Sequence, residues 1–459
     1  MKPVRLALFS PLPPVRSGIA DYTVELLGTL GASHEIDVFV ASPEETAAWP
    51  PGRARFTVRN AHDFVWARVR TPYDLVVYQL GNAWCHDYTW PYLFKWPGLV
   101  VLHDANLHHA RAWSLLRRFR GRDYRAELAF NHPALSPDAG EIGLSGFSGP
   151  LYYCWPMLRT VVASARAVAV HNPRLAADLA TEFPDTPVRA IPMGVADPIA
   201  PDEAARTIRQ RHGFGPEAVV LSAFGGITPE KRIEAVLQAL AVARRYQPDV
   251  RLLLVGQAMT HFDAPAAARA LGVDDLVTIA GYVRDDEMPA YLAASDVVLS
   301  LRWPSGRETS ASWLRAIASG RPTVVTDLAQ HADLPTLDPR SWTVVHAQPT
   351  LERLEPVGVG IDILDEAHSL TLALKRLTTD AALRARLGAA ARGHWTAGHT
   401  VDRMASTYDD VLREAAGLPD PVVRLPSHLR PDGAAHARRL MAAFPDATIL
   451  RAQLPTSGN

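Results

Sequence analysis

The sequence predicts an α/β protein made of two doubly wound domains, each with a mostly parallel sheet. Short apolar runs alternate with longer amphipathic stretches, a pattern typical of βα units. The alternation occurs twice, and a turn-rich passage from Met193 to Pro201 separates the two series. The 459 residues suffice for two domains of about 200 residues each.

The first series predicts an N-terminal domain over residues 1–195. Its strands are expected at Val4–Phe9, Glu35–Val40, Leu75–Gln79, Leu99–Leu102, Ala167–His171 and Val188–Ile191. Its helices are expected at Tyr22–Leu30, Tyr92–Trp96, Met157–Ser164 and Pro173–Phe183. The section from Arg111 to Gly149 is polar and has no clear period, so we expect an irregular insertion or lid there.

The second series predicts a C-terminal domain over residues 196–393. Its strands are expected at Val219–Phe224, Arg251–Val255, Val277–Ala280, Val297–Ser300 and Thr323–Thr326. Its helices are expected at Ile233–Tyr246, Pro265–Leu271, Met288–Ala294 and Ser312–Ala318. The tail from Leu418 to Asn459 holds several prolines and a helical stretch at Ala434–Phe444, and we expect an appendage.

Composition excludes several classes of protein. The 47 Lys and Arg balance 48 Asp and Glu, so no global field attracts nucleic acid. The 2 cysteines, Cys85 and Cys154, cannot form a disulfide framework. Prolines interrupt the N-terminal apolar run, and no apolar run approaches ~18 residues, so we expect a cytoplasmic protein without a membrane span.

Gly18 follows the first strand and opens a helix. In an open α/β sheet, ligands bind beyond the carboxyl ends of the strands, and a glycine at a helix start lets backbone amides approach an anion. Gly18 is therefore a candidate for close substrate approach, or else part of an ordinary turn. The turn has no G-x-G-x-x-G pattern, so the fingerprint of a dinucleotide-binding domain is missing.

His103 stands at the end of an apolar strand, where it can face a cleft between the domains. Two interpretations are open. His103, Asp104, His108 and His109 could ligate zinc or iron, although their spacing matches no helix-borne metal motif. We favour a substrate contact by His103, with His108 and His109 structural and no metal.

The second domain contains two candidate phosphate-binding turns. In the first, Gly225 and Gly226 follow a strand and Lys231 comes soon after, which would supply amides and a positive charge. In the second, Thr309 and Ser310 begin a helix whose free amides and dipole favour a diphosphate. Glu308 beside them either caps the helix or accepts hydrogen bonds from sugar hydroxyls.

These motifs, in this order, resemble the family-4 glycosyltransferases of the GT-B fold, which has two facing Rossmann-like domains. The resemblance rests on the turn at Gly18, the His-Asp pair at His103, Pro192 to Val195, the Pro-Glu-Lys turn at Lys231, and Glu308 before its helix. It covers most of Val4 to Leu412. It implies that a helix near the chain end, here His394–Leu412, crosses back to the N-terminal domain, so residues 394–459 form a crossover helix and tail.

The resemblance also implies site residues. Lys231 would hold the donor diphosphate, Val283 would follow the strand end that contacts the nucleobase, and Glu308 would serve the sugar or the ribose. Two positions depart from the family pattern, because Gly226 stands where an arginine is usual and Arg315 where a glutamate holds the ribose. We expect another cation to replace the missing arginine, with Arg302 as the first candidate, Arg315 second and Arg307 third.

The implied reaction is retaining, metal-independent transfer of a hexosyl group from a nucleotide diphosphate sugar to an acceptor hydroxyl, without a bound cofactor. Such transfer serves polysaccharide or glycoconjugate biosynthesis, with a carbohydrate, lipid-linked or small-molecule acceptor and peripheral membrane contact as an option. Three alternatives remain open. They are a non-catalytic GT-B protein that binds nucleotide sugar, a nucleotide-sugar epimerase, and a phosphorylase, for which no lysine suggests itself as the pyridoxal phosphate anchor.

Overall fold

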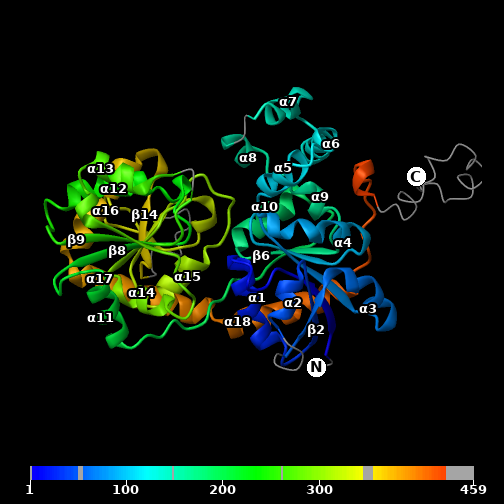
Figure 1. Cartoon of the computed structure of the whole chain (residues 1–459), viewed down its shortest axis with the longest axis horizontal. Helices are drawn as coiled ribbons and strands as arrows, with labels where there is room; N and C mark the ends of the chain where they lie inside the picture. Colours follow the sequence, from blue (N-terminus) through cyan, green and yellow to red (C-terminus); the bar gives the residue numbers. More distant parts are fainter. Residues whose placement is uncertain (1–2, 50–54, 147–148, 260–261, 345–354, 431–459) are drawn as a thin grey trace, which may run out of the picture.

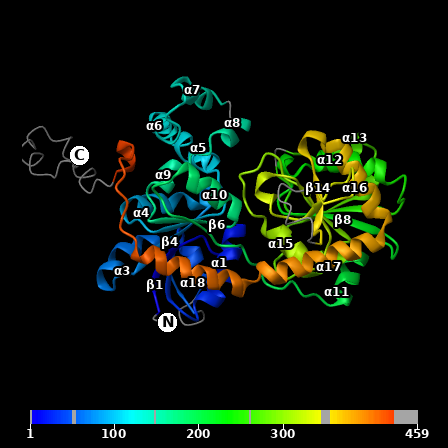
Figure 2. The same cartoon turned by 180° about the vertical axis from the view of Figure 1, so that it is seen from behind.

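Two α/β lobes lie side by side, and the last helices of the chain run behind both of them (Figures 1 and 2). The computed structural model describes residues 3–49, 55–146, 149–259, 262–344 and 355–430. The predicted stretch Ala434–Phe444 lies outside these residues.

The first lobe contains a seven-stranded parallel sheet in the order β3-β2-β1-β4-β5-β6-β7. The strands are β1 (Arg5–Phe9), β2 (Glu35–Val40), β3 (Thr57–Asn60), β4 (Leu75–Leu80), β5 (Leu99–Leu102), β6 (Ala167–Val170) and β7 (Val188–Ala190). The helices are α1 (Gly18–Leu30), α2 (Pro43–Ala47), α3 (Phe64–Arg70), α4 (Trp90–Lys95), α5 (His108–Leu116), α6 (Gly121–Asn131), α7 (Asp138–Leu144), α8 (Pro150–Cys154), α9 (Arg159–Val162) and α10 (Pro173–Glu182).

The second lobe contains another seven-stranded parallel sheet, in the order β10-β9-β8-β11-β12-β14-β13. Its strands are β8 (Val219–Phe224), β9 (Val250–Val255), β10 (Val277–Gly281), β11 (Val297–Ser300), β12 (Thr323–Thr326), β13 (Thr336–Leu337) and β14 (Gly358–Ile361). Its helices are α11 (Asp202–Arg211), α12 (Ile233–Ala243), α13 (Ala264–Ala270), α14 (Met288–Ala294), α15 (Ala311–Ala318), α16 (Glu366–Thr379) and α17 (Ala381–Gly398). The predicted α/β class with two parallel sheets is confirmed.

Both faces of the first sheet are buried, which explains why its strands are almost wholly apolar. Along β1, Leu6 and Leu8 join the core under α1, whereas Ala7 and Phe9 join the core under α4 and α10. This alternation follows from the two-residue period of a strand. The sheet is therefore fixed in register, and its carboxyl edge presents a set of loops in fixed places.

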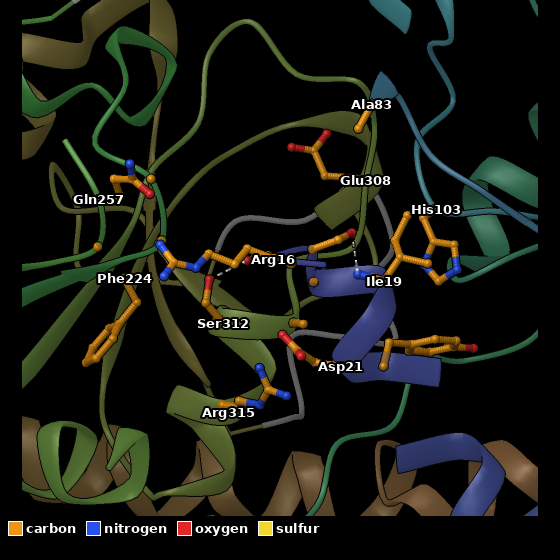
Figure 3. A pocket seen from close by; sticks show the side chains of 18 of the residues that line it. Arg16, Ile19, Asp21, Ala83, His103, Phe224, Gln257, Glu308, Ser312 and Arg315 are labelled. Carbon is orange, nitrogen blue, oxygen red and sulfur yellow. Dashed lines mark hydrogen bonds between the residues drawn. The ribbon is translucent and has the colours of Figure 1, made fainter. Parts of the chain in front are cut away.

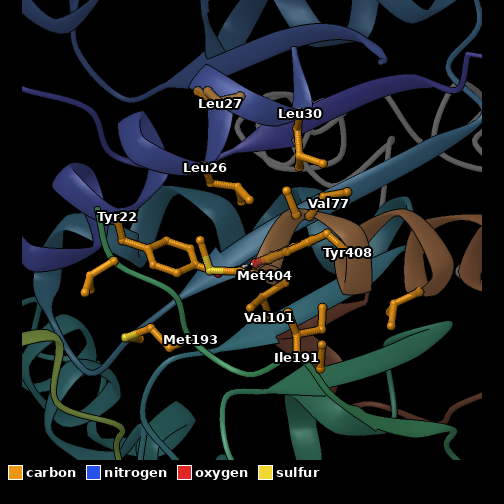
Figure 4. Close-up of a cluster of buried hydrophobic side chains, with 14 of the residues drawn as sticks. Tyr22, Leu26, Leu27, Leu30, Val77, Val101, Ile191, Met193, Met404 and Tyr408 are labelled. Carbon is orange, nitrogen blue, oxygen red and sulfur yellow. Dashed lines mark hydrogen bonds between the residues drawn. The ribbon is translucent and has the colours of Figure 1, made fainter. Parts of the chain in front are cut away.

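The end of the chain returns to the first lobe. Helix α18 (Val401–Gly417) packs against α1, and the hydroxyl of Tyr408 lies 2.6 Å from that of Tyr22 among apolar side chains such as Met404 (Figure 4). The expectation of one continuous helix over His394–Leu412 is wrong, because α17 ends at Gly398 and α18 begins at Val401. The side chain of Thr400 caps the new helix by accepting a hydrogen bond from the amide of Arg403.

The segment expected to be irregular is also different. Helices α5, α6 and α7 occupy much of residues 111–149, and they enclose a small core of their own around Leu115, Tyr124 and Leu128. The sequence did not predict these helices because few apolar residues hold them together, and the segment is otherwise polar. The domain boundaries at residues 195 and 393 stay predictions.

Within the described ranges, no helix combines the length and the apolar character needed to cross a membrane.

Candidate functional site

A cavity of about 950 Å³ lies between the two lobes and takes its walls from both. It sits beyond the carboxyl ends of β1, β4 and β5 in the first sheet and of β8, β9 and β11 in the second. Parallel α/β sheets bind ligands at this edge. Figure 3 shows Arg16, Asp21 and His103 from the first lobe facing Glu308 and Arg315 from the second.

The start of α1 forms one rim of the cavity. Ser17 caps the helix by accepting a hydrogen bond from the amide of Ile19, and Gly18 lines the cavity with open space where a side chain would stand. Arg16 reaches across to the second lobe, where its guanidinium lies 4.6 Å from the centre of the Tyr282 ring. Gly18 thus borders the cavity, its approach to a substrate stays a prediction, and the sequence analysis did not single out Arg16.

His103 lines the cavity but is 8% exposed, and both ring nitrogens have buried partners. Its Nε2 lies 2.7 Å from Oε1 of Gln79, and its Nδ1 lies 3.2 Å from Nε2 of His171. Burial and the neighbouring His171 hold the pKa of His103 well below its usual value, so the ring is neutral. In this arrangement both ring nitrogens of His103 already have partners in the protein. The predicted direct contact between His103 and a sugar is not tested by this geometry and stays a prediction.

Asp104, the next residue, was assigned only a place in the metal alternative. Its Oδ2 accepts a hydrogen bond from the amide of Asn82 at 2.7 Å. Burial, and then the charge of Glu308, raises the pKa of Asp104 to about 6. The amide of Ala105 donates to the carbonyl of Gly306 at 2.7 Å, so the two loops that carry these carboxyl groups touch across the cleft.

The glycine turn after β8 leads to Lys231, whose Nζ donates a hydrogen bond to the carbonyl of Phe224 at 2.6 Å. Gly225 adopts φ +97°, a conformation that favours glycine, and Gly226 is exposed, with Met259 and Thr228 3.9 Å from the position that a Cβ atom would take. Desolvation, and then the charge of Arg302, lowers the pKa of Lys231 to about 7. Gly225, Gly226 and Lys231 all line the cavity, and their contact with a donor stays a prediction.

Arg302 and Glu308 form an ion pair in the cavity wall, with Nε 2.5 Å from Oε1. Ser305 donates to the other carboxylate oxygen of Glu308 at 3.0 Å. The guanidinium of Arg302 is on the cavity side and close enough to Lys231 to affect its pKa. The structure thus brings together the expected replacement cation, Lys231 and Glu308.

The start of α15 completes this wall. Ser310 caps the helix by accepting from the amide of Trp313, and Thr309, Ser310 and Ser312 line the cavity. Val283 is buried beneath the same cavity, behind the strand end of β10. All of them border the cavity, and their contact with a donor stays a prediction.

Arg315 has a different set of partners from those the sequence suggested. Its guanidinium lies 2.7 Å from Oε1 of Glu25 on α1, so this pair joins the two lobes. Asp21 and Asp285 lie nearby, and burial followed by the charge of Asp285 raises the pKa of Asp21 to about 7. No sequence signal predicts this cluster, because its members are distant in the chain.

The alternative metal site receives no geometric support from its histidines. His108 is buried, with Nδ1 2.7 Å from the carbonyl of Trp155 and Nε2 2.8 Å from the Tyr124 hydroxyl, and Nδ1 of His109 lies 3.0 Å from the side-chain nitrogen Nδ2 of Asn82. Across the residues that the structure describes, no three His, Cys, Asp or Glu side chains are grouped so as to hold a metal ion. His108 thus contacts α6 and the end of α8, and His109 contacts the loop after β4.

One wall of the cavity therefore carries cations and helix-start amides suited to a diphosphate, and the facing wall carries polar groups suited to hydroxyls. This division defines a two-domain protein that can hold an anionic ligand with a hydroxyl-rich end.

Comparison with known proteins agrees with this class. Residues 218–344 match the family model of the glycosyl transferases group 1. A GDP-mannose-dependent alpha-(1-6)-phosphatidylinositol monomannoside mannosyltransferase of Mycolicibacterium smegmatis is 29% identical over 398 residues, which cover 85% of this chain and 93% of that protein. Mannosylfructose-phosphate synthase of Agrobacterium fabrum is 32% identical over 152 residues, which cover 30% of this chain and 32% of that protein, so the match spans about a third of its length.

Among solved structures, the HepE protein of Anabaena in complex with UDP-glucose superposes with a TM-score of 0.61 at 14% identity, covering 89% of this chain and 100% of that chain. This likeness shows the GT-B fold. The protein is thus related to the group 1 glycosyltransferases of GT-B type, and assignment to family 4 stays a prediction.

Proposed function

We propose that the protein is a retaining, metal-independent hexosyltransferase of family 4, which moves a sugar from a nucleotide diphosphate donor to an acceptor hydroxyl. The observation that carries the proposal is the interlobe cavity, where Lys231, Arg302 and the start of α15 face the polar wall of the first lobe.

The second lobe would hold the donor. Breaking the bond between the sugar and the diphosphate leaves charge on the phosphate oxygens, and a preorganised set of cations and amides stabilises that charge. Lys231 and the amides at the start of α15 supply this set. Glu308, which is paired with Arg302 and Ser305, would accept hydrogen bonds from the donor sugar.

The names of related proteins suggest donors and acceptors for a first assay. GDP-mannose is named for the mycobacterial relative, which acts on a phosphatidylinositol mannoside, and UDP-glucose is bound in the HepE structure. We propose a cytoplasmic enzyme that uses such a donor with a carbohydrate, lipid-linked or small-molecule acceptor, and that needs no bound cofactor.

A lipid-linked acceptor would require peripheral membrane contact, and exposed aromatic side chains of the first lobe suit it. Trp84, Trp113 and Phe119 are exposed, and the guanidinium of Arg117 lies 4.7 Å from the centre of the Trp113 ring. Aromatic side chains next to cations are typical of surfaces that meet anionic bilayers. Sedimentation with phosphatidylglycerol vesicles, compared with phosphatidylcholine vesicles, tests this contact.

The alternatives make different predictions. Calorimetry with UDP, GDP, UDP-glucose and GDP-mannose tests binding, and release of UDP or GDP with and without EDTA tests turnover. We expect binding of a sugar nucleotide and slow release of its nucleotide that EDTA leaves unchanged. Binding without turnover would indicate a non-catalytic protein, conversion to another sugar nucleotide an epimerase, and inhibition by EDTA a metal-dependent reaction.

A further inference from the structure

His86 lies in the wall of the interlobe cavity and has no role in the site described so far. It belongs to the 3₁₀ helix η2 (Trp84–Thr89) after β4 and is 1% exposed. Its Nδ1 lies 3.0 Å from the backbone carbonyl of Gln79. A carbonyl oxygen only accepts hydrogen bonds, so Nδ1 carries the proton.

The other ring nitrogen is therefore a lone-pair acceptor. Burial lowers the pKa of His86 to about 4, which keeps the ring neutral at pH 7. Its Nε2 is buried and has no hydrogen-bond partner among the described residues. Because a buried acceptor without a donor is costly, this nitrogen calls for a donor from within the cavity.

Both acceptors lie beside Gly81. A Cβ atom on Gly81 would stand 3.3 Å from Nε2 of His86, 3.1 Å from Oδ2 of Asp104 and 2.4 Å from Cδ1 of Ile19, so both acceptors border a small region that the end of the Ile19 side chain occupies. Asn82 fixes the carboxyl group of Asp104 through its amide. Ile19, His86 and Asp104 all line the cavity, so one hydroxyl-rich ligand can reach both acceptors once the end of the Ile19 side chain turns aside.

The charges nearby decide the ligand class. Lys231 and Arg302 across the cavity disfavour a cationic ligand, and neither Nε2 of His86 nor the carboxylate of Asp104 donates to an anion. Neutral hydroxyl groups are the donors that fit. We infer that His86 and Asp104 form a subsite on the first-lobe wall that binds adjacent hydroxyls of a sugar or cyclitol.

This inference rests on the proposed function and deepens it. The polyol is either the sugar of the donor or the acceptor, since both carry adjacent hydroxyls and both would lie between the lobes. The nucleotide diphosphate, held by the second lobe, does not contact His86.

The test separates the two ring nitrogens. His86→Asn keeps a donor for the Gln79 carbonyl and removes the acceptor that faces the cavity, whereas His86→Gln places an amide oxygen near the position of Nε2. The exposed His62 supplies a matched control as His62→Asn. We expect His86→Asn to bind UDP or GDP like the wild type, His86→Gln to retain most activity, and His62→Asn to be unchanged.

Measurements of donor binding and of the acceptor KM show whether the polyol is the donor sugar or the acceptor. If the donor sugar fills the subsite, His86→Asn weakens UDP-glucose or GDP-mannose binding about fivefold without affecting UDP or GDP. If the acceptor fills it, donor binding and hydrolysis stay at the wild-type level, and the KM for glucose or myo-inositol as acceptor rises by about the same factor. Wild-type values for all of these in His86→Asn, or an equal loss in His86→Gln, would overturn the inference.

A crystal structure of the protein with glucose or myo-inositol tests the subsite in the absence of any nucleotide. A hydroxyl within hydrogen-bond distance of Nε2 of His86 supports the inference, and either polyol bound elsewhere, or not at all, overturns it. A wild type that binds none of the four nucleotides refutes the proposed function instead, and the two failures are thereby distinguished.

Discussion

Lys231 should make donor binding depend on pH. Its pKa is about 7 in the free protein because desolvation, and then the charge of Arg302, disfavours the ammonium form. A diphosphate beside Nζ restores the pKa of Lys231 toward its ordinary value of 10.5, so binding takes up a proton whenever Lys231 is neutral beforehand. The affinity is therefore highest below pH 7 and falls as the pH rises above it.

The size of the effect follows from the shift. Lys231 is half protonated at pH 7 and about 1% protonated at pH 9, so the affinity for a sugar nucleotide should fall about 50-fold, or about 2 kcal/mol, over that range. Calorimetry with UDP-glucose or GDP-mannose at pH 6, 7, 8 and 9 measures it. These donors suit the assay because their diphosphate does not titrate in this range.

Lys231→Arg is the matched control, because a guanidinium stays charged throughout the range. Asp104 and Asp21 also titrate near neutral pH and face the cavity, with pKa values of about 6 and about 7. Both are present in the variant, so the difference between the two profiles isolates Lys231. Parallel profiles between pH 7 and 9 would refute the reasoning.

Three further outcomes follow from the structure. Arg302→Ala should weaken UDP or GDP binding by about 1.5–3 kcal/mol, and Gly226→Arg should rescue it in the same background; a calorimetric double-mutant cycle without rescue contradicts the exchange. Tyr408→Phe should lower the free energy of unfolding in urea by about 1–3 kcal/mol, because the buried Tyr22 hydroxyl loses its partner, and an unchanged midpoint would speak against it. The pKa of Asp21 is raised from 3.8 to about 7, so between these values the native state holds more protons than the unfolded state, and the stability of the wild type falls as the pH rises through them. Asp21→Asn should lack this fall when melting temperatures at pH 4 and pH 8 are compared. An equal change of melting temperature in the wild type and the variant would count against the reasoning.

The sequence predicts most of the strands because both sheets are parallel and buried, which gives continuous apolar runs. It misses β14, where Gly358 and Gly360 interrupt the signal. The structure explains the first glycine, since a Cβ on Gly358 would stand 2.7 Å from the carbonyl of Thr323 on the neighbouring strand. Helix α11 is missed because Ile208 is its one buried residue, which leaves no apolar period to detect.

Some residues of the candidate site can likewise be predicted from the sequence, and others cannot. Lys231, Thr309 and Glu308 follow strands or begin helices, so local patterns place them at the carboxyl edge of the second sheet. His86 and the pair of Arg315 with Glu25 depend on contacts between segments that no local pattern connects. Strand ends can thus be located from one sequence, whereas hydrogen-bond partners across a cleft require the fold.

The pairing of Arg302 with Glu308 connects the two requirements of the donor site. In the free protein the carboxylate balances a guanidinium that would otherwise lie unpaired beside Lys231. A diphosphate competes for that guanidinium, and the oxygens of Glu308 that it releases can then accept hydrogen bonds from sugar hydroxyls. An arginine at Gly226 has open space and would serve the phosphates without drawing on this pair. Gly226→Arg should therefore strengthen the binding of UDP or GDP more than the binding of the corresponding sugar nucleotide in the wild-type background. The reason is that Glu308 stays paired with Arg302 and cannot accept hydrogen bonds from the sugar. Equal gains for both ligands would show that the ion pair does not control Glu308.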